Sequence, residues 1–276
     1  MADAYSRAVI TGAGSGLGRA LALRFARAKW KIAVADINLA GAEETLAQVI
    51  AAGGSGFAQR CDVRSESDFT LLTERLKREW GGVDVVVNNA GVAAAGGVAE
   101  TSLADWAWML DINLMGVVRG CHAFVPMLKA QNRGHVVNVA AFAAFASMPG
   151  MASYNVAKAG VLSLSETLRG ELHGHGVGVT VACPAFFKTN LLDSFRSPDP
   201  AQKKLPALMM KASRVTADEV ADAIYRAVRD NTFLVLSDTP SRNLYRAKRL
   251  SPELAFRWMM RVKAFAERKA GARMAS

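Results

Sequence analysis

The sequence predicts an α/β protein built on a doubly wound parallel sheet, and two patterns in the chain support this prediction. Seven short apolar runs alternate with longer amphipathic stretches. Strands that are apolar on both faces and joined by helical crossovers are typical of a parallel sheet covered by helices on both sides. A glycine-rich segment also follows the first apolar run and precedes a helical stretch, as in a nucleotide-binding βα turn.

The individual elements follow from the same patterns. The apolar runs predict strands at residues 8–11, 31–36, 56–62, 83–89, 135–140, 178–184 and 232–237. Between them, apolar residues that recur at spacings of three and four predict helices, for example over 17–30, 40–53 and 66–80. Residues 194–206 have the proline and polar content of a mobile loop.

Length and composition indicate one large domain, because 276 residues that are 51% hydrophobic can bury a sizeable core. The cysteines Cys61, Cys121 and Cys183 are odd in number and widely spaced, which argues against disulfides and a zinc site and favours a reducing cytoplasm. We expect no signal peptide, since the first residues lack its basic and apolar regions. Residues 134–157 are free of charge, but Pro149 and polar residues interrupt them, so we expect no membrane span there.

The net charge of +10 is concentrated near the C-terminus. Residues 240–276 contain ten Lys or Arg and two Glu, which gives +8, and the first 239 residues carry the remaining +2. We therefore divide the chain into a main domain, 1–239, and a basic helical extension, 240–276. The nearly neutral main domain does not indicate a nucleic-acid-binding protein.

The segment TGAGSGLG, residues 11–18, is a candidate site for the phosphates of a dinucleotide. Its glycines permit a tight turn and let backbone N–H groups approach a pyrophosphate at the amino end of the next helix. The following predicted strand ends at Asp36, whose carboxylate suits hydrogen bonds from an adenosine ribose and repels a 2′-phosphate. We therefore expect NAD in preference to NADP. The alternative is that Asp36 only caps the helix that begins near Leu39.

Tyr154 and Lys158 are four residues apart, so on a helix their polar ends converge on one face. A tyrosine with an ordinary pKa of about 10 is a poor base at neutral pH, whereas a fixed ammonium beside it favours the phenolate. The pair therefore fits a proton-transfer site. On most helices, however, the same spacing describes a core tyrosine beside a solvated lysine.

Six segments over about residues 7–195 resemble the short-chain dehydrogenase/reductase family in type and order. They are TGAGSGLG, Asp62-Val63, Asn88-Asn89-Ala90-Gly91, Asn113 in DINLMG, Tyr154-x-x-x-Lys158, and Pro184 with Thr189. The resemblance implies a single Rossmann-like domain with seven parallel strands, assembled as a homodimer or homotetramer.

The resemblance also implies hydride transfer between a nicotinamide cofactor and an alcohol or ketone. Tyr154 would exchange a proton with the substrate oxygen, Lys158 would lower the tyrosine pKa and hold the nicotinamide ribose, and Asn113 would hold a water that links Lys158 to solvent. Outside this motif, Asn113 would be interpreted as a polar helix residue that satisfies a backbone carbonyl. The implied cofactor contacts are Gly12, Ser15, Gly16, Leu17, Gly18, Asp36, Ile37, Asp62, Val63, Asn89, Ala90, Gly91, Tyr154, Lys158, Pro184 and Thr189.

Two positions depart from the family pattern. The catalytic serine, thirteen residues before the tyrosine, is replaced by Ala141, and Pro184 is followed by Ala185 where glycine is usual. Because the other motifs are intact, we favour a serine-to-alanine replacement made to trap a complex, with reduced activity, and a natural alanine is the alternative. A cofactor-binding protein with little catalysis would also fit the missing serine.

Apolar residues dominate the segments that line the substrate pocket by family position. The main candidates are Phe142, Met148, Phe186, Leu191 and Leu192, and a lid is expected over about 190–214. Flexible, methionine-rich walls suit bulky apolar ligands. We therefore expect a hydrophobic secondary alcohol or ketone, such as an aryl, long-chain or steroid-like compound.

The C-terminal extension has an amphipathic pattern, with four apolar residues on one helical stripe and three arginines on another face. The apolar residues are Leu254, Trp258, Val262 and Phe265, and the arginines are Arg257, Arg261 and Arg268. One interpretation is a helix packed on its own body or on a neighbouring subunit. The other is a basic helix that lies on an anionic membrane surface and makes a cytoplasmic protein membrane-associated.

Overall fold

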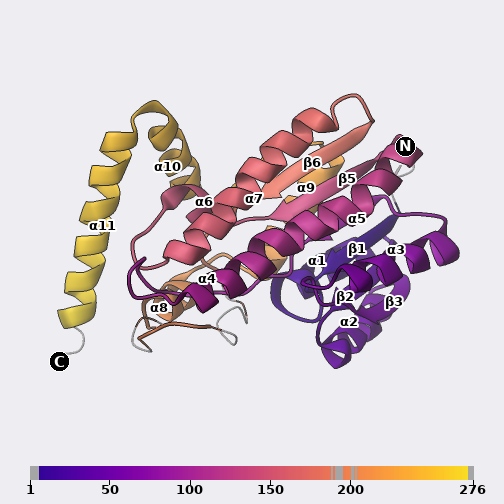
Figure 1. Ribbon diagram of the computed structural model, residues 1–276, viewed down its shortest axis with the longest axis horizontal. Helices are drawn as coiled ribbons and strands as arrows, with labels where there is room; N and C mark the ends of the chain where they lie inside the picture. The colour runs from indigo at the N-terminus through magenta and orange to yellow at the C-terminus, as the bar shows by residue number, and fades with distance from the viewer. Residues whose placement is uncertain (1–5, 188, 190–194, 200–201, 203, 273–276) are drawn as a thin grey trace.

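Seven parallel strands form one sheet at the centre of the protein (Figure 1). The computed structural model describes residues 6–187, 189, 195–199, 202 and 204–272. The strands are β1 (Arg7–Thr11), β2 (Lys31–Asp36), β3 (Ser55–Arg60), β4 (Val85–Asn88), β5 (Gly134–Val139), β6 (Val177–Ala182) and β7 (Leu234–Val235). Their order is β3-β2-β1-β4-β5-β6-β7. The predicted fold class, a doubly wound parallel sheet, is confirmed.

Helices cover both faces of this sheet. The helices of the described chain are α1 (Gly16–Ala26), α2 (Leu39–Ala51), α3 (Glu66–Trp80), α4 (Leu103–Leu110), α5 (Gly116–Gln131), α6 (Ala143–Ala146), α7 (Ala152–Glu171), α8 (Lys204–Ala212), α9 (Ala217–Arg229), α10 (Thr239–Leu250) and α11 (Pro252–Ala272), of which α10 and α11 lie beyond the sheet. Residues of α1, α2 and α9 form one core cluster, and residues of α3, α5 and α7 form the other. Strand β1 shows the division, because Ala8 and Ile10 belong to the first cluster and Val9 to the second.

The order of the strands reverses between β1 and β4. The chain first builds outward through β2 and β3, and then returns to place β4 against the free side of β1, with Ile10 opposite Val87. The crossovers on the two sides leave in opposite directions, so a crevice opens beyond the carboxyl ends of β1 and β4. Ligands of doubly wound sheets bind in this crevice.

The predicted boundaries differ most where the chain leaves the sheet. The helix expected over 17–30 ends at Ala26, because the chain turns at Lys29, which has a left-handed φ of 63°. The strand expected over 232–237 pairs with β6 only at Leu234 and Val235, as fits the last strand at the edge of the sheet. Cys61, Cys121 and Cys183 are buried free thiols. Within the described part of the chain, no helix has the length and apolar character to span a bilayer.

Helices α4 and α5 are joined by a short π-helix, η1 (Asp111–Met115), which contains Asn113. The extra residue per turn in a π-helix shifts the side chains that follow it, and such turns are frequent at functional sites. Here the π-turn directs the Asn113 side chain into the protein interior, where it is fully buried.

Candidate active site

The glycine-rich turn between β1 and α1 packs against the segment that follows β4. Gly12 has a left-handed φ of 64°, and a Cβ atom there would lie 2.7 Å from the Cα of Ala90. A Cβ at Gly18 would collide with the carbonyl oxygen of Gly12. Ser15, at the N-cap of α1, provides no side-chain hydrogen bond to the first turn. The turn thus offers closely approachable backbone and a helix amino terminus without a side-chain cap, which fits a pyrophosphate group.

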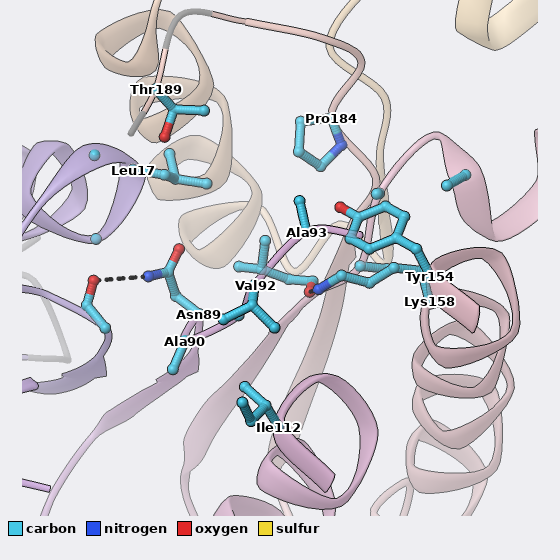
Figure 2. Close-up of a pocket in the computed structure, with 18 of the residues that line it drawn as sticks. Leu17, Asn89, Ala90, Val92, Ala93, Ile112, Tyr154, Lys158, Pro184 and Thr189 are labelled. Atoms are coloured by element: carbon cyan, nitrogen blue, oxygen red, sulfur yellow. Dashed lines mark hydrogen bonds between the residues drawn. The ribbon is translucent and has the colours of Figure 1, made fainter. Parts of the chain in front are cut away.

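Asn89 fastens the end of β4 to this turn. Its Nδ2 donates to the carbonyl oxygens of Thr11, at 2.9 Å, and Gly12, at 3.1 Å. Figure 2 draws one of these bonds. In return, Thr11 Oγ1 accepts hydrogen bonds from the backbone N–H groups of Asn89 and Ala90. The glycine turn and the Asn-Asn-Ala-Gly segment therefore form one fixed wall of the crevice.

Asp36 lies at the carboxyl end of β2 and lines the same cleft. Its Oδ2 accepts from the Gly14 N–H at 2.8 Å, and its Oδ1 accepts from the Asn38 N–H at 2.9 Å. Helix α2 is capped by Asn38, whose side chain accepts from the Gly41 N–H. The alternative interpretation of Asp36 as the cap of α2 is therefore wrong, and its carboxylate belongs to the glycine turn.

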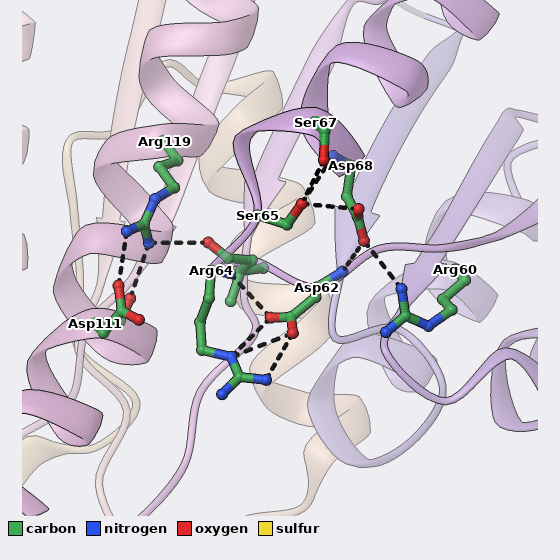
Figure 3. Close-up of polar contacts among 9 residues, drawn as sticks. Arg60, Asp62, Arg64, Ser65, Ser67, Asp68, Asp111 and Arg119 are labelled. Carbon is green, nitrogen blue, oxygen red and sulfur yellow. Dashed lines mark hydrogen bonds and ion pairs between the residues drawn. The ribbon is translucent and has the colours of Figure 1, made fainter.

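A network of charged residues shapes the cleft at the end of β3 (Figure 3). Arg64 binds the Asp62 carboxylate through Nε and Nη2, with a shortest distance of 2.7 Å, and this pairing lowers the pKa of Asp62. Arg119 donates to the carbonyl oxygen of Val63 and forms an ion pair with Asp111 at 2.7 Å. Arg64 also lines the cleft, which the family motifs did not indicate.

Tyr154 and Lys158 project from α7 into the same cavity (Figure 2). Both are buried, and Lys158 Nζ donates to the carbonyl oxygen of Val139 at 2.9 Å. Nζ lies 5.9 Å from the centre of the Tyr154 ring. The lysine is therefore tied to the end of β5, which fixes its ammonium beside the tyrosine.

Burial dominates the electrostatics of this pair. It raises the pKa of Tyr154 and lowers that of Lys158 to about 8, because both charged forms lose contact with water. The direction for Tyr154 is opposite to the one expected from the charge of Lys158 alone. The buried tyrosine is thus a protonated group with a hydroxyl that can donate to an oxygen atom.

Asn113 does not line the cleft. Its Oδ1 accepts from the Val92 N–H at 2.8 Å, and its Nδ2 donates to the Val92 carbonyl oxygen at 2.8 Å. A Cβ at Gly91 would lie 2.7 Å from this Oδ1. The side chain is therefore occupied in shaping residues 91–92, as in the structural interpretation, and a water held by Asn113 remains a prediction.

Ala141 lies just beyond the end of β5, in an apolar cluster with Tyr154, Met109 and Ala157. No hydroxyl stands at this position to assist Tyr154. Asn155, the residue after Tyr154, is polar and also lines the cavity. Its Nδ2 donates to the Met148 carbonyl oxygen at 2.7 Å, and its buried Oδ1 has no hydrogen-bond partner among the described residues.

All sixteen expected cofactor contacts line one cleft of about 570 Å³, together with an apolar wall at the Tyr154 end. The larger side chains of this wall are Trp108, Phe142, Met148, Met151, Phe186, Phe187, Phe195 and Met210. Phe142, Met148 and Phe186 are thus placed in the wall, whereas Leu191 and Leu192 lie outside the described residues. Trp108 was missed because nothing in the spacing of α4 residues shows which of them meets the cleft.

Comparisons with known proteins agree with this geometry. The sequence profile of the family described as short chain dehydrogenase matches residues 6–200. The chain is 37% identical over 229 residues to "Probable oxidoreductase EphD" of Mycobacterium tuberculosis, a match that covers 80% of this chain and 39% of that longer protein. It is 32% identical over 192 residues to the 3-oxoacyl-(acyl-carrier-protein) reductase of Synechocystis sp., which covers 69% of this chain and 77% of the reductase.

A solved structure extends the agreement to the whole fold. The short-chain dehydrogenase/reductase from Burkholderia phymatum, crystallised in complex with NAD, is 32% identical and superposes with a TM-score of 0.85 over 92% of this chain and 96% of its own. The profile match and this superposition cover most of the chain, including the glycine turn and the Tyr154–Lys158 pair. The chain therefore belongs to the short-chain dehydrogenase/reductase family.

Proposed function

We propose that the protein transfers a hydride between NAD and a bulky, hydrophobic secondary alcohol or ketone. The observation that carries this proposal is the position of Tyr154 and Lys158 where a glycine-lined cleft meets an apolar wall. The cleft offers the cofactor a helix amino terminus and a carboxylate, and the wall offers the substrate aromatic and methionine side chains. The polar groups that touch a reacting oxygen would be few.

The two residues of α7 have distinct roles in this proposal. When bound, the nicotinamide supplies or accepts the hydride, and its oxidised ring adds a positive charge to the cleft. Tyr154 donates its proton to a ketone oxygen during reduction and accepts the proton of an alcohol during oxidation. Lys158, held by the Val139 carbonyl, stabilises the phenolate that reduction leaves and donates to the cofactor ribose.

Two observations support NAD as the preferred cofactor. Asp36 places a carboxylate at the glycine turn, where it would accept ribose hydrogen bonds and repel a 2′-phosphate. Ile37, the next residue, is exposed and uncharged. Arg64 lines this part of the cleft, but Asp62 engages it in a bidentate ion pair, and Arg19, which donates to the Gly14 carbonyl oxygen, is paired with Glu44.

A substrate panel tests the proposal. Aryl, long-chain and steroid-like ketones are assayed with NADH and NADPH, with Tyr154→Phe as the inactive control and Tyr225→Phe, a core tyrosine of α9, as the matched control. Turnover of apolar ketones that Tyr154→Phe abolishes would support the proposal. Binding of NADH without turnover of any member, even after serine is restored at position 141, would favour a cofactor-binding protein instead.

We also propose a role for Ala141, a division into two parts, and an oligomeric assembly. Ala141 is the site of a serine-to-alanine replacement. The replacement reduces activity, because the alanine cannot donate a hydrogen bond to the substrate oxygen and its described apolar neighbours cannot do so in its place. Residues 1–239 form the catalytic domain and 240–276 an extension. The subunits assemble as a homodimer or homotetramer in the cytoplasm, where the three free thiols remain reduced.

A further inference from the structure

We propose that the C-terminal helices form a docking surface for an anionic lipid bilayer. The surface consists of Leu250 at the end of α10 and of Leu254, Arg257, Trp258 and Arg261 on α11, and is called the tail surface. Figure 1 shows α11 at one end of the molecule, packed along α10 and extending away from the sheet.

Helix α11 packs on the protein through a narrow inner stripe. Ala255 is buried and Met259 is partly buried in a cluster with Leu244 of α10 and Ala146 of α6. The predicted apolar stripe is not this inner stripe. Its described members, Leu254 and Trp258, are 63% and 50% exposed, and the side chains of Val262 and Phe265 lie outside the described residues. The interpretation that this stripe packs on the body is therefore wrong for Leu254 and Trp258.

The exposed apolar residues adjoin positive charge. Leu250, the last residue of α10, is 87% exposed, and Leu254 and Trp258, one turn apart on α11, are exposed as well. Arg257 and Arg261, both exposed, lie next to Leu254 and Trp258 respectively on the helix surface, each three residues after its neighbour. Residues 240–276 contain ten basic and two acidic residues, which gives a net charge of +8, whereas the rest of the chain carries +2.

This combination fits a bilayer better than a protein or a nucleic acid. A helix with leucine and tryptophan beside arginine lies in the membrane interface, where apolar side chains enter the acyl boundary and basic ones meet anionic headgroups. A second copy docked symmetrically on this surface would bring its arginines close to those of the first. Nucleic acid would leave Leu250 and Leu254 in water.

The tail surface is also connected to the apolar wall of the cleft. Phe142 and Met148 line the cavity and pack in the same cluster as Met259 and Leu244. Lys248 of α10 donates to the Phe145 carbonyl oxygen at 2.7 Å, which holds the extension against this wall. A bilayer on the tail surface would therefore lie close to the substrate chamber. This step rests on the proposed apolar substrate, whereas docking itself does not.

Vesicle co-sedimentation tests the docking surface without any substrate. The full chain is mixed with phosphatidylserine–phosphatidylcholine vesicles or with phosphatidylcholine vesicles, at low and at high salt. We expect binding to the anionic vesicles at low salt, and at least about tenfold weaker binding at high salt or without anionic lipid. Absence of binding to anionic vesicles at low salt overturns the proposal.

Paired variants locate the surface. Leu254→Ser with Trp258→Ser, and separately Arg257→Glu with Arg261→Glu, should each weaken anionic-vesicle binding at least about tenfold. Matched controls are Leu71→Ser, which is 60% exposed, and Lys77→Glu, both on α3 at the opposite end of the molecule (Figure 1). Equal losses in the control and tail variants would overturn the assignment. So would tail variants that lower the mass of the assembly without lowering vesicle binding, since a second copy would then be the occupant.

A second readout separates this inference from the proposed function. Tyr154→Phe should bind anionic vesicles as the unaltered protein does, although it lacks turnover. With an apolar ketone dissolved in the bilayer, anionic vesicles should raise the initial rate of the unaltered protein severalfold and leave the Leu254→Ser, Trp258→Ser protein unchanged. If the protein bound the vesicles without this increase in rate, the proposed delivery of substrate from the bilayer would be overturned, but the proposed docking surface would stand.

Discussion

At the scale of single residues, burial decides the chemistry of the cleft as much as residue type does. Tyr154 and Lys158 have the spacing expected of a proton-transfer pair, but withdrawal from water raises the pKa of the first and lowers that of the second. Ala141 makes the pair unusually isolated, because it packs in an apolar cluster against Tyr154. The small change from alanine to serine at position 141, which also lines the cleft, should therefore act mainly on turnover.

We expect Ala141→Ser to raise kcat at least about tenfold, with little change in cofactor affinity. One donor directed at the reacting oxygen is worth about 10²–10³ in rate in comparable sites. Steady-state kinetics with a good apolar ketone and NADH titrations measure the two quantities. Ala94→Ser is the matched control, since Ala94 packs in the same apolar cluster as Ala141 but does not line the cleft. Equal turnover by the Ala141→Ser and unaltered proteins would show that this site does not use a serine.

We expect Asp36→Ala to reduce the preference for NADH over NADPH about tenfold, through loss of a ribose acceptor and of repulsion toward a 2′-phosphate. The change also removes the acceptor of the Gly14 and Asn38 N–H groups, so Asp36→Asn, which keeps an acceptor, isolates the effect of charge. Glu43→Ala, an exposed carboxylate of α2, is the control, since Glu44 pairs with Arg19 at the glycine turn. Fluorescence titration with both cofactors provides the measurement, and tighter binding of NADPH by the unaltered protein would contradict the prediction.

At the scale of elements, two sets of buried polar contacts fix how neighbouring strands are aligned. The apolar residues of the strands alone would specify this alignment less strongly. Asp84, which directly precedes β4, is fully buried and accepts from the Arg7 guanidinium at 2.6 Å and from Arg133 at 3.0 Å. His135 of β5 lies 2.7 Å from Thr180 of β6, whose hydroxyl donates to the Thr232 carbonyl oxygen. Because the Thr180 hydrogen is used in this way, the imidazole Nε2 carries a proton and donates to the Thr180 oxygen.

This histidine should make stability depend on pH. Burial lowers the pKa of His135 to about 4 from an ordinary 6.5, so its contribution is complete above about pH 6.5 and is lost as the pH falls toward 4. The difference amounts to about 3 kcal/mol in the free energy of unfolding. Urea titrations at pH 7.5 and 4.5 measure it, with His135→Gln expected to reduce the dependence. His173→Gln, at an exposed position after α7, should leave the dependence as it is, and an equal effect of both changes would argue against His135.

At the scale of the whole molecule, the body and the extension have different charge and different surfaces. The main domain is closed around two cores, whereas α11 leaves Leu254, Phe256 and Trp258 at least half exposed. We expect light scattering after gel filtration to give two or four times the chain mass of 29.5 kDa. The Leu254→Ser, Trp258→Ser protein should have the same mass, because its tail surface is assigned to lipid. A mass of one chain for the unaltered protein would contradict the proposed assembly.

The sequence by itself determined the fold class and the residues at the two ends of the cleft, the glycine turn at one end and the Tyr154–Lys158 pair at the other. The signals that led to them are local patterns, which can be recognised in the sequence without knowledge of distant contacts. They are the consecutive apolar residues of the strands, the helical periodicity between them, the glycines after β1 and the spacing of Tyr154 and Lys158. Most strand positions followed from them, and so did the placement of the expected cofactor residues along one edge of the sheet.

Only the tertiary structure decided which partners those residues have. Asn113 meets Val92 through a π-turn, Trp108 and Arg64 reach the cleft, and α11 packs through Ala255 and Met259 rather than through Leu254 and Trp258. Contacts between residues far apart in the chain leave no periodic mark in the sequence. Desolvation, which sets the pKa values of Tyr154 and Lys158, depends on everything packed around a group, and therefore exists only once the chain has folded.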